Sequence, residues 1–588
     1  MKEFFKIVFA SMVGVFFAAI IMTLIGFVLI IGIVAVAGSD KKADVEPNSV
    51  LRIALNSPIG ERTPNNPLAG LGIFGDADKS IGLKDILANI KKAKTDSNIK
   101  GIFIDESSIE TGQATIEEIR NALIDFKKSG KFIIAYSEVY SQAFYYLASV
   151  ADKVYINPKG IFELKGFSSQ ITFLKGALDK LGVEVQIIKV GTYKSAVEPF
   201  FLTKMSDANR LQVTSYLGSM YDHFLTGISN SRHINKDTLF NYANNMRIRE
   251  PEDALKYKLV DGLKYKDEIL DELRQRTGLS SKADVKGVEI SEYTDAKADV
   301  EVAKNEIAVV YASGEISGGD GDDNSIGSEG ISKALRKVRM DNKIKAVVLR
   351  VNSPGGSSLA SDVIWREVML TKKVKPIIVS MGDVAASGGY YISCAADSIF
   401  AEPNTITGSI GIFAILPNMQ KLFNDKLGIT FDGVKTGKYA DLGDVSRPLS
   451  PDERLILQNQ VNRGYDEFTK AVAKGRNKTQ EYINSIGQGR VWTGEQALKI
   501  GLVDRLGNID DAIKCAAKKA NLKGYKLETY PEQKSILSKF GLGTSAAIKA
   551  HFVKSELGEN YKYYEQIKGV TQLMRTPQAR MPYDVVIR

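Results

Sequence analysis

The distribution of apolar residues divides the chain into one long apolar run followed by many short, alternating segments. Residues 7–38 contain no charged residue and are mostly Ile, Val, Phe, Leu and Ala. This run exceeds the roughly 20 residues that a helix needs to cross the core of a bilayer. No later segment has an uncharged apolar run of this length. The sequence therefore predicts one membrane-spanning helix, with the rest of the chain on one side of the membrane.

The apolar run is predicted to stay in place as an anchor. Ala35-Val36-Ala37 is similar to a signal-peptidase site, but the apolar region of a cleavable signal is only about 7–15 residues long. Lys2 and Lys6 precede the run, and Lys41 and Lys42 follow it. Because basic residues flank both ends, the charges do not decide the orientation in the membrane.

Strand-like and helix-like patterns alternate after the apolar run. Short β-rich apolar runs occupy residues 101–104, 132–135, 346–349 and 377–380, and helical periodicity occupies 116–128 and 360–371. This alternation predicts a parallel α/β core, and uniformly apolar strands suit a sheet that is covered on both faces. Sites in such folds collect in the loops that leave the strand ends, which is where the glycine clusters of this chain lie.

The chain contains an internal duplication. When it is aligned with itself at an offset of 245 residues, matching positions recur without a gap between Ser80 and Gly166. The matches include Ser80-Ile81-Gly82 with Ser325-Ile326-Gly327, Tyr145-Tyr146 with Tyr390-Tyr391, Ala151-Asp152 with Ala396-Asp397, and, at an offset of 243, Leu259-Val260-Asp261 with Leu502-Val503-Asp504. We therefore expect an anchor (1–45), two copies of one domain (46–300 and 301–526) and a C-terminal extension (527–588).

Composition excludes several classes of function. Lys plus Arg number 78 against 69 for Asp plus Glu, and no dense basic block indicates a nucleic-acid groove. Cys394 and Cys515 lack the CxxC spacing of a zinc ribbon or redox pair. The three histidines lie far apart in the sequence. We expect no metal, no cofactor and no nucleic-acid partner.

A glycine-rich loop is present in the second copy alone. Asn352-Ser353-Pro354-Gly355-Gly356 directly follows a predicted strand, so its unobstructed backbone N–H groups suit an oxyanion hole. The first copy has no glycine pair at this register, between Ser107 and Thr111. A tight turn is the alternative interpretation of Pro-Gly-Gly.

The second copy also places a serine between glycines, in Gly408-Ser409-Ile410-Gly411, where the first copy has Leu164. A serine nucleophile needs a base, and these segments lack histidine. A lysine serves if burial lowers its pKa. Lys194 of the first copy, which aligns with Ala440, and Lys438 of the second copy are the two candidates. With Lys194, each copy would hold half of a dyad.

Five motifs together resemble the signal peptide peptidase A (protease IV) family in its long, membrane-anchored, duplicated bacterial form. The resemblance covers nearly the whole chain. The motifs are Val351-Asn352-Ser353-Pro354-Gly355-Gly356, Ala386-Ser387-Gly388-Gly389-Tyr390-Tyr391, Thr407-Gly408-Ser409-Ile410-Gly411, Gly191-Thr192-Tyr193-Lys194-Ser195-Ala196-Val197-Glu198-Pro199-Phe200, and Gly489-Arg490-Val491-Trp492-Thr493-Gly494.

The resemblance implies tandem ClpP/crotonase-like domains and a serine endopeptidase that cleaves signal peptides and other hydrophobic peptides after their release from preproteins. It implies Ser409 as nucleophile, Lys194 as general base, and backbone amides near Gly356 and at Ser409 as oxyanion donors. Ser387 is expected to order a helix start or line the pocket. The resemblance also implies a single-pass protein that forms a homotetramer on the outer, periplasmic face of the bacterial cytoplasmic membrane.

Two other classes of function compete with this hypothesis. Crotonase relatives stabilise acyl-CoA enolates with a similar oxyanion hole, and a membrane-bound scaffold would bind hydrophobic peptides without cleaving them. The anchor and the Ser/Lys pair argue against an acyl-CoA enzyme. The complete set of candidate residues across the two copies argues against a scaffold.

Overall fold

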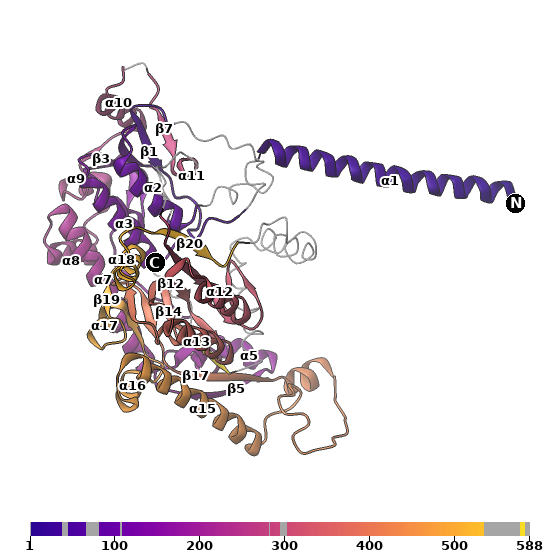
Figure 1. The fold of residues 1–588 in the computed structure, drawn as a ribbon. Coiled ribbons are helices and arrows are strands. Elements are labelled where there is room, and N and C mark those ends of the chain that lie inside the picture. Colours follow the sequence, from indigo (N-terminus) through magenta and orange to yellow (C-terminus); the bar gives the residue numbers. More distant parts are fainter. Residues whose placement is uncertain are drawn as a thin grey trace.

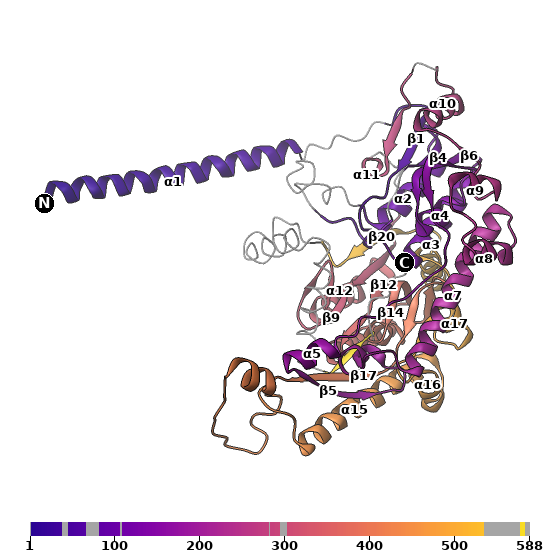
Figure 2. The same ribbon diagram turned by 180° about the vertical axis from the view of Figure 1, so that it is seen from behind.

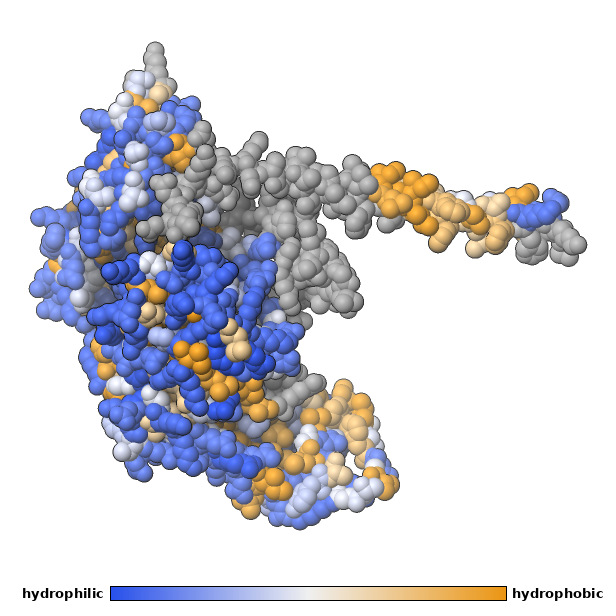
Figure 3. All heavy atoms as spheres, viewed as in Figure 1, coloured by the Kyte–Doolittle hydropathy of each residue, from blue (hydrophilic) through white to orange (hydrophobic). Residues whose placement is uncertain are grey.

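The computed structural model describes residues 2–37, 45–65, 81–105, 109–280, 283–294, 303–533 and 577–581. Its first element is the helix α1 (Lys2–Ala37), which projects away from the folded body (Figures 1 and 2). Within α1, Lys6–Gly26 is long and apolar enough to cross a membrane, and none of it is buried. Figure 3 shows its apolar surface in orange. The predicted N-terminal apolar helix is thus present.

The first copy forms a six-stranded sheet in the order β6-β4-β3-β2-β1-β7, and all its strand pairs are parallel. The strands are β1 (Ser49–Ile53), β2 (Ile99–Asp105), β3 (Phe132–Tyr140), β4 (Lys153–Phe162), β6 (Gly262–Leu263) and β7 (Gly287–Glu289). The helices are α2 (Leu83–Thr95), α3 (Gln113–Lys127), α4 (Gln142–Ala148), α7 (Asp207–Arg232), α8 (Lys236–Asn244), α9 (Pro251–Lys256), α10 (Lys266–Thr277) and α11 (Ile290–Tyr293).

The second copy forms an eight-stranded sheet whose main path is β18-β16-β14-β12-β8-β20, with β15 and β19 beside it. The strands are β8 (Glu306–Ser313), β12 (Ile344–Ser353), β14 (Ile377–Ala386), β15 (Ser398–Ala401), β16 (Ile406–Gly408), β18 (Val491–Thr493), β19 (Arg505–Leu506) and β20 (Lys526–Tyr530). The helices are α12 (Ser328–Met340), α13 (Ser358–Lys372), α14 (Gly388–Ser393), α15 (Pro451–Arg476), α16 (Gln480–Ile486), α17 (Gly494–Lys499) and α18 (Ile509–Lys519).

The two sheets repeat the same succession of elements. β2 and β12, α3 and α13, and β3 and β14 each begin 245 residues apart, and the central strands follow the same order in both sheets. The strands β2 and β12 are buried along most of their length, because helices cover the sheets as they do in other mainly parallel sheets. The prediction of tandem α/β domains is confirmed, whereas their exact boundaries stay a prediction.

A third sheet joins segments that are distant in the sequence, in the order β10-β11-β9-β13-β21-β17-β5. Its strands are β5 (Glu184–Val190), β9 (Glu315–Ser317), β10 (Gly321–Asp322), β11 (Ser325–Gly327), β13 (Gly355–Ser357), β17 (Ile412–Asn418) and β21 (Gln578–Arg580). β5 comes from the first copy and pairs with β17 of the second over seven residues. Short helices adjoin β5 and β17: α5 (Lys175–Leu181), η3 (Ser195–Val197), α6 (Glu198–Phe201) and η4 (Leu422–Leu427).

A buried charge network also connects the two copies. The guanidinium of Arg350 in β12 is fully buried and donates to Glu61 at 2.8 Å and to Glu118 of α3 at 2.5 Å. Burial and the charge of Glu61 raise the pKa of Glu118, although Arg350 acts in the opposite direction. One arginine of the second copy therefore forms ion pairs with two buried carboxyl groups of the first copy.

Candidate active site

Ser387 occupies the sharp turn between β14 and α14. Its backbone has φ 54° and ψ −113°, a combination that strains a residue with a side chain. The turn is held because Ser387 N donates to Gly408 O and Tyr391 N donates to Ser387 O, both at 2.8 Å. The Ser387 side chain is thus fixed at the carboxyl end of a central strand, where sites of α/β folds collect.

Ser409 follows β16, the strand next to β14 in the sheet. It also has a positive φ, 50°, and it is fully buried. Its backbone N–H donates to Arg490 O at 2.7 Å. The amide that the sequence predicts as an oxyanion donor is therefore already engaged, and it must be released before it can bind an oxyanion.

Lys194 belongs to the first copy, and its side chain contacts both serines of the second copy. Its Nζ lies 2.9 Å from Ser387 Oγ, 3.1 Å from Ser409 Oγ and 3.1 Å from Ser409 O. The pairing of β5 with β17 explains this approach, since Val190 lies opposite Ile412 and the chain then reaches Lys194 four residues later. In the structure, Lys194 of the first copy thus lies within hydrogen-bond distance of Ser409, as predicted. It lies at a similar distance from Ser387, which the sequence did not predict as its partner.

Two glycines make room for Lys194. A Cβ on Gly411 would lie 3.0 Å from the Cδ of Lys194, and a Cβ on Gly489 would lie 2.6 Å from its backbone N. Gly489 also has φ 80°, which favours glycine. Both positions belong to motifs on which the family resemblance rests, so these motifs have a packing role around the lysine.

Gln212 of α7 holds the residues on both sides of Lys194. Its Nε2 donates to Tyr193 O at 3.1 Å and to Ser195 Oγ at 2.7 Å, while its Oε1 accepts from Val491 N at 3.2 Å. Gln212 therefore ties the lysine segment of the first copy to β18 of the second. Sequence reasoning missed this residue, because an isolated glutamine in a helix has no motif around it.

The electrostatics favour a neutral amine at Lys194. The side chain is fully buried, and burial is the one resolved cause that lowers its pKa well below the ordinary 10.5. Removal from water disfavours an ammonium. A neutral amine beside a hydroxyl is able to accept its proton.

The glycine-rich loop packs against the Ser387 turn. A Cβ on Gly355 would lie 2.7 Å from Gly388 N, and Gly355 and Gly356 have φ angles of 98° and 156°. The Gly355 N–H donates to Ser353 Oγ at 3.1 Å. The loop thus packs against the Ser387 turn at Gly355, and Gly356, the predicted oxyanion donor, is the next residue along this loop.

The alternative base Lys438 and the repeated tyrosines of the duplication are not part of this Ser/Lys cluster. Lys438 is exposed and forms an ion pair with Asp452, so the structure does not bring this alternative base to the serines. Tyr390 and its counterpart Tyr145 are buried, and their hydroxyls donate to equivalent backbone carbonyls, those of Leu502 and Leu259. Among the described residues, no group of three or more His, Cys, Asp or Glu side chains could hold a metal ion.

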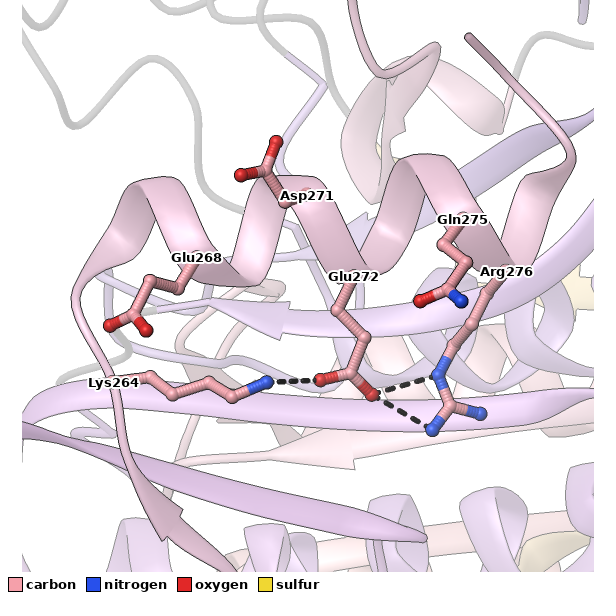
Figure 4. A pocket seen from close by; sticks show the side chains of 6 residues that line it. All are labelled: Lys264, Glu268, Asp271, Glu272, Gln275 and Arg276. Carbon is pink, nitrogen blue, oxygen red and sulfur yellow. Dashed lines mark hydrogen bonds and ion pairs between the residues drawn. The ribbon is translucent and has the colours of Figure 1, made fainter. Parts of the chain in front are cut away.

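A polar hollow on the first copy is separate from this cluster. It lies along α10 (Figure 4), whereas the Ser/Lys cluster comes from β14, β16 and the segment after β5. Its central residue, Glu272, forms ion pairs with Lys264 at 2.6 Å and Arg276 at 2.8 Å. Glu272 is thus occupied by two cations of the hollow itself.

Comparison with known proteins identifies the family. The profile of Peptidase family S49 matches residues 125–280 and 369–523, together just over half of the chain. The chain belongs to peptidase family S49. The first S49 segment contains Lys194, and the second contains Ser387 and Ser409. The predictions of a duplicated chain and of a serine peptidase are thus confirmed.

Relatives of this S49 peptidase match along most of their length. Protease 4 of Salmonella typhi is 37% identical over 523 residues, which cover 86% of this chain and 84% of the relative. Protease 4 of Haemophilus influenzae is 37% identical over 75% of this chain and 74% of its own. The chloroplastic serine protease SPPA of Arabidopsis thaliana is 33% identical over 83% and 72%. Among solved structures, a ClpP1 mutant from Listeria monocytogenes is 19% identical and covers 35% of this chain and 94% of its own, with a TM-score of 0.24.

Proposed function

We propose that this S49 peptidase is a membrane-anchored endopeptidase that cleaves signal peptides and other hydrophobic peptides after their release from preproteins. Lys194 acts as general base in a Ser/Lys dyad shared by the two copies. The observation that carries the proposal is the fully buried amine of Lys194, which lies 2.9 Å from Ser387 Oγ and 3.1 Å from Ser409 Oγ. No carboxylate is among the resolved causes of its pKa shift.

Of the two serines, the geometry favours Ser387 as the nucleophile over Ser409, the residue predicted from sequence. Ser387 stands in a strained strand-to-helix turn, which projects a hydroxyl from the end of a strand in the manner of a nucleophile elbow. It also adjoins the glycine-rich loop, since Gly388 N would lie 2.7 Å from a Cβ on Gly355. Ser409 instead presents both its hydroxyl and its carbonyl to Nζ, which suits a residue that orients the lysine.

The geometry supports a two-step acyl transfer. Ser387 Oγ attacks the carbonyl carbon of the substrate while Nζ of Lys194 takes the hydroxyl proton. The tetrahedral oxyanion is stabilised by backbone N–H groups at Gly356 and at the start of α14. Lys194 then gives its proton to the leaving amine, and the acyl-enzyme forms. A water molecule, deprotonated by Lys194, attacks the ester and releases the carboxylic acid product and Ser387.

Membrane attachment and assembly belong to the same proposal. Lys6–Gly26 has the length and composition of a membrane span, and it would hold the catalytic copies near the bilayer surface. The family resemblance favours the outer face of the bacterial cytoplasmic membrane and a homotetramer.

Peptide cleavage by detergent-solubilised variants tests the function. We expect wild type to cleave a signal-peptide-like substrate, and Ser387→Ala and Lys194→Ala to lose about 10⁴-fold or more in kcat, as other serine peptidases do without a member of their catalytic set. Ser409→Ala removes one hydrogen-bond partner of Lys194, a net effect of about 0.5–1.5 kcal/mol, which corresponds to a loss of about 2- to 12-fold.

Two other results would change the assignment. Full loss in Ser409→Ala with activity retained in Ser387→Ala would make Ser409 the nucleophile. Absence of cleavage by folded wild type would favour a peptide-binding scaffold. Circular dichroism and gel filtration of each variant provide the check that it is folded and assembled.

A further inference from the structure

The end of the chain supplies a strand to the sheet beside the candidate active site. β21 lies between β13 and β17 and is antiparallel to both. Ser358 N donates to Pro577 O at 3.3 Å, and Met581 N donates to Pro354 O at 2.7 Å. Residues 577–581 therefore extend along the glycine-rich loop through backbone hydrogen bonds.

This strand lies against the Ser387 turn. Gly356, the predicted oxyanion residue, is paired with Ala579. A Cβ on Gly355 would lie 2.0 Å from Ala579 O, and a Cβ on Gly388 would lie 3.0 Å from the same atom. Glycines at these two positions thus leave space for a peptide backbone next to the nucleophile.

The side chain of Met581 fills a space, the Met581 pocket, in an apolar cluster that includes chain neighbours of both serines. Met581 is 4% exposed and belongs to one cluster with Val213, Tyr216, Met220, Ala386, Ile406 and Val491. Ala386 immediately precedes Ser387, and Ile406 lies in β16, which ends one residue before Ser409. The pocket takes one unbranched apolar side chain from an extended peptide.

We infer that residues 577–581 occupy the substrate groove of this chain and that peptide substrates bind in their place. The inference rests on the proposed peptidase function. A substrate adds an antiparallel strand between β13 and β17, a common mode of peptide recognition, and places an apolar side chain in the Met581 pocket. The C-terminal strand is thereby an intramolecular competitor that shields the site until a hydrophobic peptide displaces it.

The expected effect follows from occupancy of the groove. If the C-terminal strand leaves the groove free only part of the time, the apparent Kd for a peptide equals the intrinsic Kd divided by the free fraction. Met581→Asp places a charge in the apolar pocket and removes the burial that holds the strand. We expect the KM for a hydrophobic peptide to fall about tenfold, with kcat unchanged.

The test compares full-length wild type with Met581→Asp. Met340→Asp is the matched control, because it makes the same chemical change on a side chain that is 73% exposed at the end of α12. A synthetic peptide with the sequence of residues 577–581 should inhibit Met581→Asp competitively. A KM of Met581→Asp equal to that of wild type, or no inhibition by this peptide, would overturn the inference.

A binding measurement separates this inference from the proposed function. In an inactive Ser387→Ala background, the Kd of a fluorescent hydrophobic peptide should fall about tenfold when Met581→Asp is added. If wild type cleaves peptides but Met581→Asp leaves the Kd unchanged, the proposal of a competing C-terminal strand is refuted and the peptidase function stands. If Met581→Asp lowers the Kd but wild type cleaves no peptide, the peptidase function is refuted and the competing strand stands.

Folding of the variants is also informative. A deletion of residues 577–588 removes the strand without adding a charge and should lower KM in the same way. If both Met581→Asp and the deletion failed to fold, the strand would be a fixed part of the sheet rather than a displaceable competitor, which would overturn the inference.

Discussion

Removal of Arg350 provides a quantitative test of how the two copies are held together. The Arg350 guanidinium is fully buried and serves Glu61 at 2.8 Å and Glu118 at 2.5 Å. Its Nη1 also donates to Ser380 Oγ at 2.9 Å. Arg350→Met retains an apolar side chain but leaves two buried carboxyl groups without their cation.

The magnitude follows from the burial of this network. Loss of one partner from a buried ion pair typically costs about 3–5 kcal/mol, because the remaining charge is left uncompensated. We expect Arg350→Met to reduce the free energy of unfolding by about this amount. Since burial and the charge of Glu61 raise the pKa of Glu118 to about 7, the loss should be greater at pH 8 than at pH 5, where Glu118 is more fully protonated.

Urea denaturation followed by tryptophan fluorescence measures the change, because Trp365 and Trp492 both lie in the second copy. The control is the triple variant Arg350→Met/Glu61→Gln/Glu118→Gln, which removes all three charges. Replacement of a whole buried ion network by neutral groups is often close to neutral, so the triple variant should recover most of the loss. A loss below about 1 kcal/mol in the single variant, or no recovery in the triple variant, would refute this reasoning.

Further predictions concern the candidate site. Because burial lowers the pKa of Lys194, kcat/KM measured against pH should rise as the pH passes through that lowered pKa; Lys194→Arg, which stays charged, should be inactive at every pH. The unfolded chain binds a proton at Lys194 that the folded chain does not, so stability should rise with pH between the lowered pKa and about 10.5; Lys194→Met should flatten this slope in urea titrations. A Cβ on Gly356 would lie 2.1 Å from Ile316 O, so Gly356→Ala should lower both the melting temperature and kcat. Lys438→Ala should retain wild-type kcat/KM, because Lys438 pairs with Asp452 at the surface; a large loss would restore the intra-copy dyad.

The duplication and the position of Lys194 in the first copy could be predicted from sequence, because the two halves of the chain can be aligned with each other residue by residue. The two halves align without a gap between Ser80 and Gly166, and a separate local alignment, shifted by one residue, places Lys194 opposite Ala440. The structure adds the reason for its reach, which is the pairing of β5 with β17 of the other copy.

The choice between the two serines could not be made from sequence. Ser387 and Ser409 both stand next to glycine, and both surround the same amine in the structure. What distinguishes Ser387 is its backbone conformation at the start of α14, which is a property of the strand-to-helix turn and not of residue type.

The strand β21 near the C-terminus also could not be predicted from sequence. β21 has three residues, too few for an alternating pattern to be recognised, and its partners lie more than 160 residues away in the sequence. Most of the extension, residues 534–576 and 582–588, lies outside the described residues. The Tyr561-Lys562-Tyr563-Tyr564 cluster falls in this part of the chain.

The most direct test of the cross-copy dyad is covalent labelling with a serine-reactive fluorophosphonate, followed by peptide mapping with mass spectrometry. We expect one adduct on Ser387 in wild type and in Lys438→Ala, and no adduct in folded Lys194→Ala. An adduct on Ser409, or labelling of Ser387 that does not depend on Lys194, would contradict this expectation.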